Sequence, residues 1–369
     1  MENYIYERAG WPNLSCEEAP LRGLLAQLHR AQGRLYGKLD ALGFEMQDEQ
    51  QLKSISDELV TSFEIEGVTL NRSSVRSSVA KRLGLETAGL VSVPVDHNTE
   101  GAVAMALDAT QNFFLPVTVE RLLGWHSALF PSGYSGVRRI TTGAYRLGEI
   151  AIVSGVFGKE KIHYKAPPPE RVPGEMSTLL KWIGTDQGID PYVKSGIAHL
   201  WFELIHPFDD GNGRIGRAIA DLLLARADNS TRRYYSLSSQ LMKERDAYYN
   251  ELDAASGYTG DVGRWVAWFL GCLLRAVEVS DAMLEESKQK VIFFDHVRKA
   301  EINKRQATML NMLYDGFEGK LTTAKWSKIC KCSHDTALRD IESLINKGIL
   351  MRSIEGGRST SYELTALSS

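Results

Sequence analysis

The stretch HPFDDGNGRIGR, residues 206–217, holds a histidine, two adjacent aspartates, two glycines around an asparagine, and two arginines within twelve positions. Apolar residues at helical spacing flank it on both sides. They are Ile197, Leu200, Trp201, Leu204 and Ile205 before the stretch, and Ile215, Ala218, Ile219, Leu222 and Leu223 after it. We therefore expect a polar loop held between two buried helices, with the second helix beginning at about residue 212 or 213.

The start of the second helix has the composition of an anion site. Gly211 and Gly213 allow a tight turn and a close approach to a ligand, and the first N–H groups of a helix have no partner within it. Arg214 and Arg217 oppose the helix dipole at a cost of about 0.3 to 1 kcal/mol each, which a bound anion would reverse. Two guanidiniums with free amides fit a di- or triphosphate better than a single carboxylate.

The other polar residues of the loop could bind a metal ion and accept a proton beside this anion site. Mg²⁺ commonly binds polyphosphates through one or two carboxylates, which Asp209 or Asp210 could supply. His206 has a side chain suited to accepting a proton from an attacking hydroxyl. The spacing of the stretch fits neither a Walker loop nor an EF-hand.

With this loop, the sequence resembles the Fic family, whose motif is HPFx(D/E)GNGRxxR; residues 206–217 match every position. The resemblance implies a mainly α fold with a Fic helical core. It also implies an enzyme that transfers AMP from ATP to a Ser, Thr or Tyr hydroxyl and releases pyrophosphate. It implies that His206 is the general base and that Asp210 binds Mg²⁺ (or Mn²⁺). It implies that Gly211, Asn212 and Gly213 bind phosphates, and that Arg214 and Arg217 contact the β- and γ-phosphates. Phe208 would point into the core. Asp209 falls at the variable position.

A second family pattern lies upstream of the loop. Residues 62–67, SFEIEG, fit the inhibitory pattern (S/T)xxxE(G/N), on a helix expected at about residues 47–67. The resemblance implies that Glu66, preceded by Ser62, pairs with Arg217. A carboxylate on Arg217 would compete with the γ-phosphate for the same donors, so the expected activity is self-inhibited. The family also permits the reverse role, in which Glu66 helps to remove AMP from a modified target.

A hairpin at residues 145–169 interrupts the helical pattern, because YRLGEIAIVSG and KEKIHYKAPPP are rich in β-branched and aromatic residues around a turn. Its edges are either covered or used to pair with another chain. By resemblance it is the flap that docks an extended segment of the target protein. Tyr248 and Tyr249 match a position near the adenine, and the alternative is that they are ordinary helix aromatics.

Composition places these parts in a soluble, multi-domain protein. The 369 residues carry a net charge of -3, four unevenly spread cysteines and no signal-peptide pattern, which favours a reducing, cytoplasmic location. The longest apolar run, residues 265–274, is too short for a membrane span and indicates a buried helix. We expect an N-terminal helical domain at 1–98, with a helix at 21–42 and a short helix within 67–98, and a Fic core at 99–290. The first 44 residues resemble an N-terminal domain found on some bacterial Fic proteins.

The last segment, residues 300–369, has the pattern of a winged helix-turn-helix domain. Helices are expected at 307–313, 322–330 and 333–348, followed by strands around Glu355-Gly356-Gly357-Arg358. Ser333, Thr336 and Arg339 would face outward from the third helix, where such domains read DNA. Residues 303–369 hold ten Lys and Arg against seven Asp and Glu. DNA binding, a protein contact and a homodimer all remain open, and so does a nucleotide-responsive transcriptional regulator as the alternative function.

Cysteines and a histidine near the start of the third helix raise the question of a metal site. Cys330, Cys332 and His334 form CxCxH, which is not a usual zinc spacing, and no second ligand pair follows. Buried thiols at a helix-turn junction are the favoured interpretation.

Overall fold

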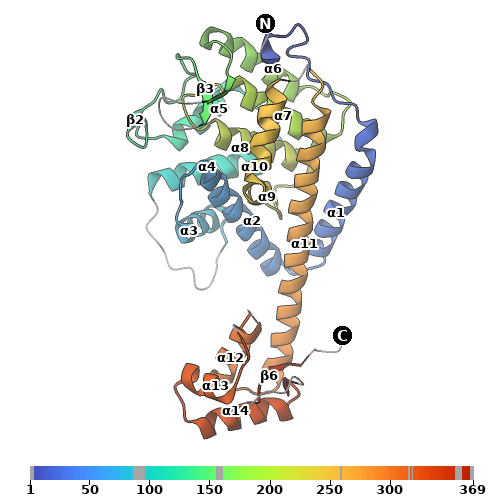
Figure 1. Ribbon diagram of the computed structural model, residues 1–369, viewed down its shortest axis with the longest axis vertical. Coiled ribbons are helices and arrows are strands. Elements are labelled where there is room, and N and C mark those ends of the chain that lie inside the picture. Colours follow the sequence, from blue (N-terminus) through green and yellow to red (C-terminus); the bar gives the residue numbers. More distant parts are fainter. Residues whose placement is uncertain are drawn as a thin grey trace. The chain divides into compact units, whose positions relative to one another are not determined.

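The structure, a computed structural model, describes residues 4–85, 96–154, 161–257, 260–314, 316–317, 319–353 and 360–365. The chain divides into two compact units, Met1–Asp281 and Ala282–Ser369 (Figure 1). The first unit contains the motif loop, and the N-terminal helices belong to this same unit.

Helices form most of the first unit, as the mainly α prediction requires. They are α1 (Arg22–Asp40), α2 (Phe44–Ile65), α3 (Arg72–Leu83), α4 (His97–Gln111), α5 (Val119–Leu129), α6 (Val172–Gly184), α7 (Pro191–Ile205), α8 (Asn212–Asp228), α9 (Leu237–Lys243), α10 (Arg245–Ser256) and the start of α11 (Gly263–Lys299), with short 3-10 turns η1 (Ile5–Glu7), η2 (Ala19–Leu21) and η3 (Pro169–Arg171). Within the described residues, no helix combines the length and apolarity needed to cross a bilayer.

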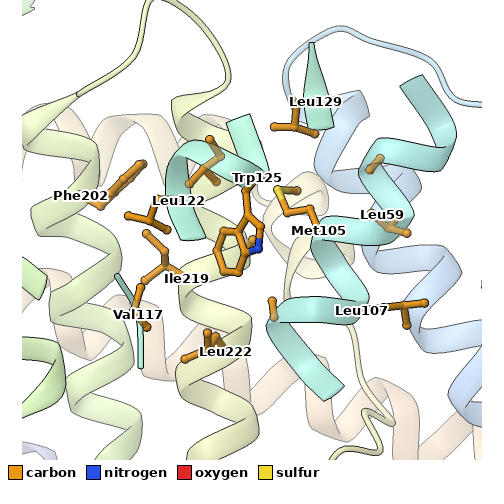
Figure 2. Packing of buried hydrophobic residues seen from close by; sticks show 14 of the residues in the cluster. Leu59, Met105, Leu107, Val117, Leu122, Trp125, Leu129, Phe202, Ile219 and Leu222 are labelled. Carbon is orange, nitrogen blue, oxygen red and sulfur yellow. The ribbon is translucent and has the colours of Figure 1, made fainter. Parts of the chain in front are cut away.

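The core of the first unit forms around α8, which packs against α7, α4, α5 and α2. Figure 2 shows Trp125 of α5 at the centre of this cluster, next to Met105 of α4 and Leu122 of α5. The indole N–H of Trp125 donates to Asp108 at 2.7 Å, so its one polar atom is satisfied. Because α2 also lines this core through Leu59, the N-terminal region and the helices of the motif fold together.

The start of α2 differs from the prediction. This helix begins at Phe44, three residues before the expected start at 47. Its first turns carry glutamines that hide the apolar periodicity, yet these side chains are buried and hydrogen-bonded. The amide of Gln47 donates to the carbonyls of Leu39 and Leu42, and that of Gln50 donates to Tyr234. Polar residues with satisfied partners thus occupy positions where an apolar pattern would be expected.

The other predicted elements are present where the structure describes them. α1 covers the expected helix at 21–42, α3 is the short helix within 67–98, and residues 265–274 lie buried within α11. The predicted hairpin is formed by β3 (Ala151–Ser154) and β4 (Lys161–Lys165), which pair antiparallel with Ile152 opposite Tyr164 and a bulge after Ile152. Its tip, residues 155–160, lies outside the described residues. A further short pair, β1 (Tyr134–Ser135) and β2 (Arg138–Arg139), precedes it.

The second unit has the element order predicted for residues 300–369. It contains α12 (Lys304–Tyr314), α13 (Thr323–Cys330), α14 (His334–Asn346), and the antiparallel pair β5 (Leu350–Arg352) and β6 (Tyr362–Leu364). Trp326 lies at 0% exposure in its apolar cluster. The expected turn residues 355–358 lie outside the described part of the chain.

The outer face of α14 and the cysteines before it can be placed in more detail. Ser333 and Arg339 are exposed and Thr336 is half-buried, but Ser333 caps α14 by accepting the N–H of Thr336 at 3.2 Å. Cys330 and Cys332 are half-buried rather than buried, because they lie at the exposed turn between α13 and α14. Among the described residues, no group of three or more His, Cys, Asp or Glu side chains is arranged to hold a metal by itself.

Candidate functional site

The motif loop is a rigid turn between α7 and α8. His206 and Gly211 both adopt left-handed backbone conformations, with φ of 50° and 86°, which redirect the chain after α7 and into α8. The side chain of Asn212 accepts the N–H of Phe208 at 2.9 Å and donates to the Phe208 carbonyl at 2.8 Å. Phe208 is fully buried, as predicted. The Asn212 side chain therefore holds the loop closed, which leaves its backbone N–H for a ligand.

A buried histidine that the sequence analysis did not single out supports this loop from α5. The Nδ1 atom of His126 accepts the N–H of Gly143 at 3.0 Å, so its Nε2 carries the proton and donates to the Asp210 carbonyl at 3.1 Å. The ring stacks on Phe208 with centroids 4.2 Å apart. Burial lowers the pKa of His126, so the imidazole is neutral.

A buried arginine, also missed by the sequence analysis, gathers the carbonyls at the end of α7. Arg146 is 1% exposed and donates to the carbonyls of His206 at 2.8 Å, Gly148 at 2.9 Å and Pro167 at 2.5 Å. Its backbone N–H donates to Pro207 at 2.9 Å. Nothing in the local sequence around Arg146 marks it, because its partners lie up to 60 residues away.

The imidazole of His206 is exposed to a cavity and otherwise buried. This cavity has a volume of about 620 Å³, and burial lowers the pKa of the imidazole to about 4. The ring is therefore neutral near pH 7 and able to accept a proton.

The two adjacent aspartates have different surroundings. Asp209 accepts the N–H of Thr141 at 2.9 Å and so ties down the segment before the flap. Asp210 accepts hydrogen bonds from the Ser135 hydroxyl, from the Gly211 N–H at 2.5 Å and from Arg214 at 3.0 Å. Partial burial would raise the pKa of Asp210, but the Ser135 hydrogen bond and the Arg214 charge lower it overall, which keeps the carboxylate ionised.

The two motif arginines lie buried at the start of α8, at 4% and 2% exposure. The guanidinium of Arg214 lies 5.1 Å from the ring centre of Phe63 and 4.9 Å from that of Phe130, so aromatic faces support its charge. Arg217 is held by α2. Its Nε donates to the Ser62 hydroxyl at 2.8 Å, and its Nη2 donates to the Ser62 carbonyl at 2.6 Å and to Glu66 at 2.8 Å.

Glu66 lies where the phosphates are expected. It follows the last residue of α2, and Gly67 turns the chain away with φ of 75°. Its carboxylate is so close to the first turn of α8 that a Cβ on Gly213 would lie 2.0 Å from the Glu66 Oε1 atom. The structure thus brings the upstream pattern and the motif into one site, with the carboxylate against the predicted anion cradle.

Two tyrosines of α10, in the stretch DAYYNEL at residues 246–252, belong to the same cavity. Tyr248 and Tyr249 line it, together with Glu66 and His206. Tyr248 is 1% exposed and forms a hydrogen bond of 2.9 Å between its Oη and the Nε2 of His199, so it is a core residue as well. Tyr249 is 39% exposed, and its ring centre lies 5.1 Å from the guanidinium of Arg245 and 5.3 Å from the ring centre of Tyr248. From the flap, Ile152 and Tyr164 complete one wall.

A buried carboxyl was missed by the sequence analysis. Glu203, one turn before His206 on α7, lines the cavity, and burial raises its pKa to about 8. Its Oε1 atom is buried and has no hydrogen-bond partner among the described residues. The missing side chain of Gly216 makes room for it, since a Cβ there would lie 2.4 Å from that oxygen. The signal was a lone acidic residue within the apolar run Trp201–Ile205.

The motif loop lies within a segment that matches a known family. Residues 116–224 match the Fic/DOC family and residues 4–85 match a domain of unknown function (DUF4172). A probable protein adenylyltransferase of Aquifex aeolicus is 42% identical over 69 residues, which are 19% of this chain and 21% of that protein. The protein adenylyltransferase Fic of Aedes aegypti is 26% identical over 266 residues, 67% of this chain and 46% of that one. The chain thus spans less than half the length of these two curated relatives.

Solved structures show the same fold. A crystal structure of a Fic family protein from Desulfovibrio desulfuricans G20 aligns with 97% of this chain and 99% of its own, at 23% identity and a TM-score of 0.54. A Fic domain containing signaling protein from Bacteroides thetaiotaomicron VPI-5482 aligns with 71% of this chain and 98% of its own, at 21% identity and a TM-score of 0.52.

Proposed function

We propose that this chain, which carries a Fic domain, transfers AMP from ATP to a Ser, Thr or Tyr hydroxyl of a target protein or of itself, and that Glu66 inhibits the transfer. One observation carries the proposal. A neutral His206, the first turn of α8 and the Glu66–Arg217 ion pair of 2.8 Å meet at one cavity of about 620 Å³. This arrangement fits a polyphosphate substrate whose seating is controlled by a carboxylate.

The transfer follows from these positions. The hydroxyl oxygen of the target bonds to the α-phosphorus while its proton passes to the imidazole of His206. The bond between the α-phosphorus and the oxygen that bridges to the β-phosphate breaks, and pyrophosphate leaves with that electron pair. Charge on the phosphates is met by Arg214, Arg217 and the free N–H groups at the start of α8, so catalysis rests on positioning and electrostatics.

A divalent metal fits this site through one protein ligand. Asp210 is ionised and 39% exposed, whereas Asp209 is engaged by Thr141. Mg²⁺ usually binds through one or two carboxylates, phosphate oxygens and water, which agrees with the lack of a metal cluster among the described residues. When bound with ATP, it would neutralise charge on the leaving pyrophosphate.

Inhibition is a competition for Arg217. The Nη2 atom that Glu66 occupies is one of the donors that a γ-phosphate would need. The two contacts of Arg217 with Ser62 do not involve Glu66, so we expect them to persist without the carboxylate. Removing the carboxylate is therefore expected to free the donor while the arginine stays in place.

The flap and the tyrosines have roles in this proposal too. Ile152 and Ile162, at 40% and 56% exposure, present apolar side chains on a sheet of two described strands. An extended segment of the target would add to such an edge. Tyr249, with Tyr248 behind it, would form the wall for the adenine.

Labelling with ATP tests the proposal. Full-length wild-type protein, Glu66→Gly and Glu66→Gly/His206→Ala are incubated with Mg²⁺ and ATP labelled at the α-phosphate, alone and with cell lysate. We expect weak labelling of the wild type, strong labelling with Glu66→Gly, and none with the double variant. If Glu66→Gly bound ATP but labelled nothing that His206→Ala removed, the proposal would be wrong.

Removal of AMP is a second candidate, favoured by the position of the Glu66 carboxylate in the cavity beside His206. A target modified by Glu66→Gly is then incubated with wild-type protein and Mg²⁺. Release of AMP by the wild type but not by Glu66→Gly would support this reverse reaction.

The second unit is proposed to be a winged helix-turn-helix module that binds DNA, on the strength of its order of three helices and a hairpin. A gel shift on the DNA upstream of the coding region, at stated salt, tests this. Gel filtration tests the alternative of a homodimer.

A further inference from the structure

Glu58 and Ser62 of α2 and Glu66, which caps the end of that helix, are three polar residues at a spacing of four, which places them along one side of it. Ser62 and Glu66 hold Arg217. Glu58 is 8% exposed and has different partners. Its Oε2 accepts the Ser236 hydroxyl at 2.8 Å and the Ser238 N–H at 2.9 Å, and its Oε1 accepts the Ser238 hydroxyl. This side of the helix thus joins the motif arginine to the segment where α9 begins.

We propose that Glu58 is a positioning residue for inhibition, which holds α2 at the axial position where Glu66 reaches Arg217. The proposal rests on the proposed function and extends it to the control of the same site. A helix rises 1.5 Å per residue, so an axial shift of one residue would break a hydrogen bond of 2.8 Å between Glu66 and Arg217. Glu58 contributes to that position through three hydrogen bonds to one short segment, while Arg245 and Tyr249 donate to the Ile65 carbonyl at the end of the helix.

A nearby carboxyl group acts in the opposite direction. Asp221 lies one turn after Arg217 on α8, and burial together with the Glu58 charge raises the pKa of Asp221. Repulsion between the two carboxyls would push α2 away from α8. However, the raised pKa favours the protonated form of Asp221, and Arg233 donates to it at 2.7 Å, so this repulsion is small. The three hydrogen bonds of Glu58 hold α2 to the α9 segment more strongly than the Thr61–Ser239 contact of 3.4 Å. Loss of the Glu58 charge should therefore loosen α2.

The experiment compares Glu58→Gln with a matched control in the full-length protein. Asp57→Asn removes the neighbouring acidic charge of α2, which pairs with the exposed Arg72 of α3 and not with the α9 segment; exposed pairs of this kind contribute little. Each change is made alone and in the Glu66→Gly background. The measurements are hydrogen exchange of the amides of residues 62–66, self-labelling with α-labelled ATP and Mg²⁺, and the melting temperature.

With Glu58→Gln we expect amide exchange at residues 62–66 and self-labelling both to rise by about tenfold, the effect of losing one charge-assisted hydrogen bond. Asp57→Asn should leave both near the wild-type values. In the Glu66→Gly background, Glu58→Gln should add nothing to labelling, because the inhibiting group is already gone. A merely structural defect would lower labelling rather than raise it.

The outcomes separate this proposal from the proposed function. If Glu66→Gly labels strongly while Glu58→Gln leaves labelling and exchange at the wild-type level, or lowers them, Glu58 does not position the helix. If no variant labels, the AMP-transfer function fails, and amide exchange alone decides on Glu58. Faster exchange at residues 62–66 would then still support its positioning role, and unchanged exchange would overturn it.

Discussion

If Glu66 and a nucleotide compete for Arg217, as proposed, the Glu66–Arg217 pair couples the stability of the fold to nucleotide binding, and Glu66→Gln tests that coupling. Arg217 is 2% exposed, and breaking a buried ion pair typically costs about 3 to 5 kcal/mol. The cost here should be smaller, because the Glu66 side chain is 30% exposed and Arg217 keeps both contacts with Ser62. We expect Glu66→Gln to lower the free energy of unfolding by about 2 kcal/mol.

Binding of a triphosphate should restore the free energy of unfolding that Glu66→Gln loses. In the wild type, the γ-phosphate must displace Glu66 from Arg217, whereas in Glu66→Gln it meets a weaker competitor. Thermodynamic linkage then allows α,β-methylene-ATP, which cannot release AMP, to bind the variant more tightly by up to the same free energy, about 30-fold in Kd. AMP lacks the β- and γ-phosphates, so its affinity should change little.

Urea denaturation and calorimetry measure the two effects. Six of the seven tryptophans lie between residues 11 and 268, so tryptophan fluorescence follows mainly the first unit. Glu64→Gln, on the same helix but without the Arg217 contact, is the control. The reasoning is refuted if Glu66→Gln is as stable as the wild type, or if AMP gains as much affinity as α,β-methylene-ATP.

Three further predictions concern the cavity and the loop. In urea titrations, the free energy of unfolding of the wild type should fall by about 2 kcal/mol relative to that of Glu203→Gln between pH 5 and pH 7, because the pKa of the folded carboxyl is raised from 4.5 to about 8 and the unfolded chain releases that proton as the pH rises. A constant difference between the two proteins would exclude a protonated Glu203. Arg146→Lys should lower kcat for labelling by about 10- to 100-fold with KM for ATP nearly unchanged, since one ammonium cannot span the carbonyls that hold His206; an unchanged kcat would contradict this. In the Glu66→Gly background, Asp210→Asn should lower labelling by about 100-fold or more and raise the Mg²⁺ concentration required, whereas Asp209→Asn should remain active; equal losses in a Mg²⁺ titration would count against the assignment.

Much of the motif loop could be predicted because its residues are adjacent in sequence. The start of α8, the burial of Phe208 and the pairing of Glu66 with Arg217 all follow from spacing and from the resemblance, and the structure contains each of them. The hairpin was also predictable, because its β-branched residues stand out from a helical background.

There is a physical reason why the residues that support the loop could not be predicted. His126, Ser135 and Arg146 reach the loop from a segment about 60 to 84 residues upstream, and each is a single polar residue in an ordinary local context. Their importance comes from burial and from the carbonyls they meet, which only the fold determines. The buried Gln47 shows the same effect, because a satisfied polar side chain looks like a surface residue in a sequence pattern.

The contacts also indicate how the proposed inhibition would work. Among the described residues, the side-chain hydrogen bonds that shape the loop come from residues 126–146, from the loop itself or from the start of α8, including those of His126, Arg146 and Asn212. At this site, Ser62 and Glu66 of the α2 segment contact Arg217 instead. Release of α2 should therefore leave His206 and Asp210 in place and change only which group, carboxylate or phosphate, binds the guanidinium of Arg217. Inhibition of this kind blocks a formed site rather than deforming it, so a single substitution at Glu66 is expected to be sufficient for activation.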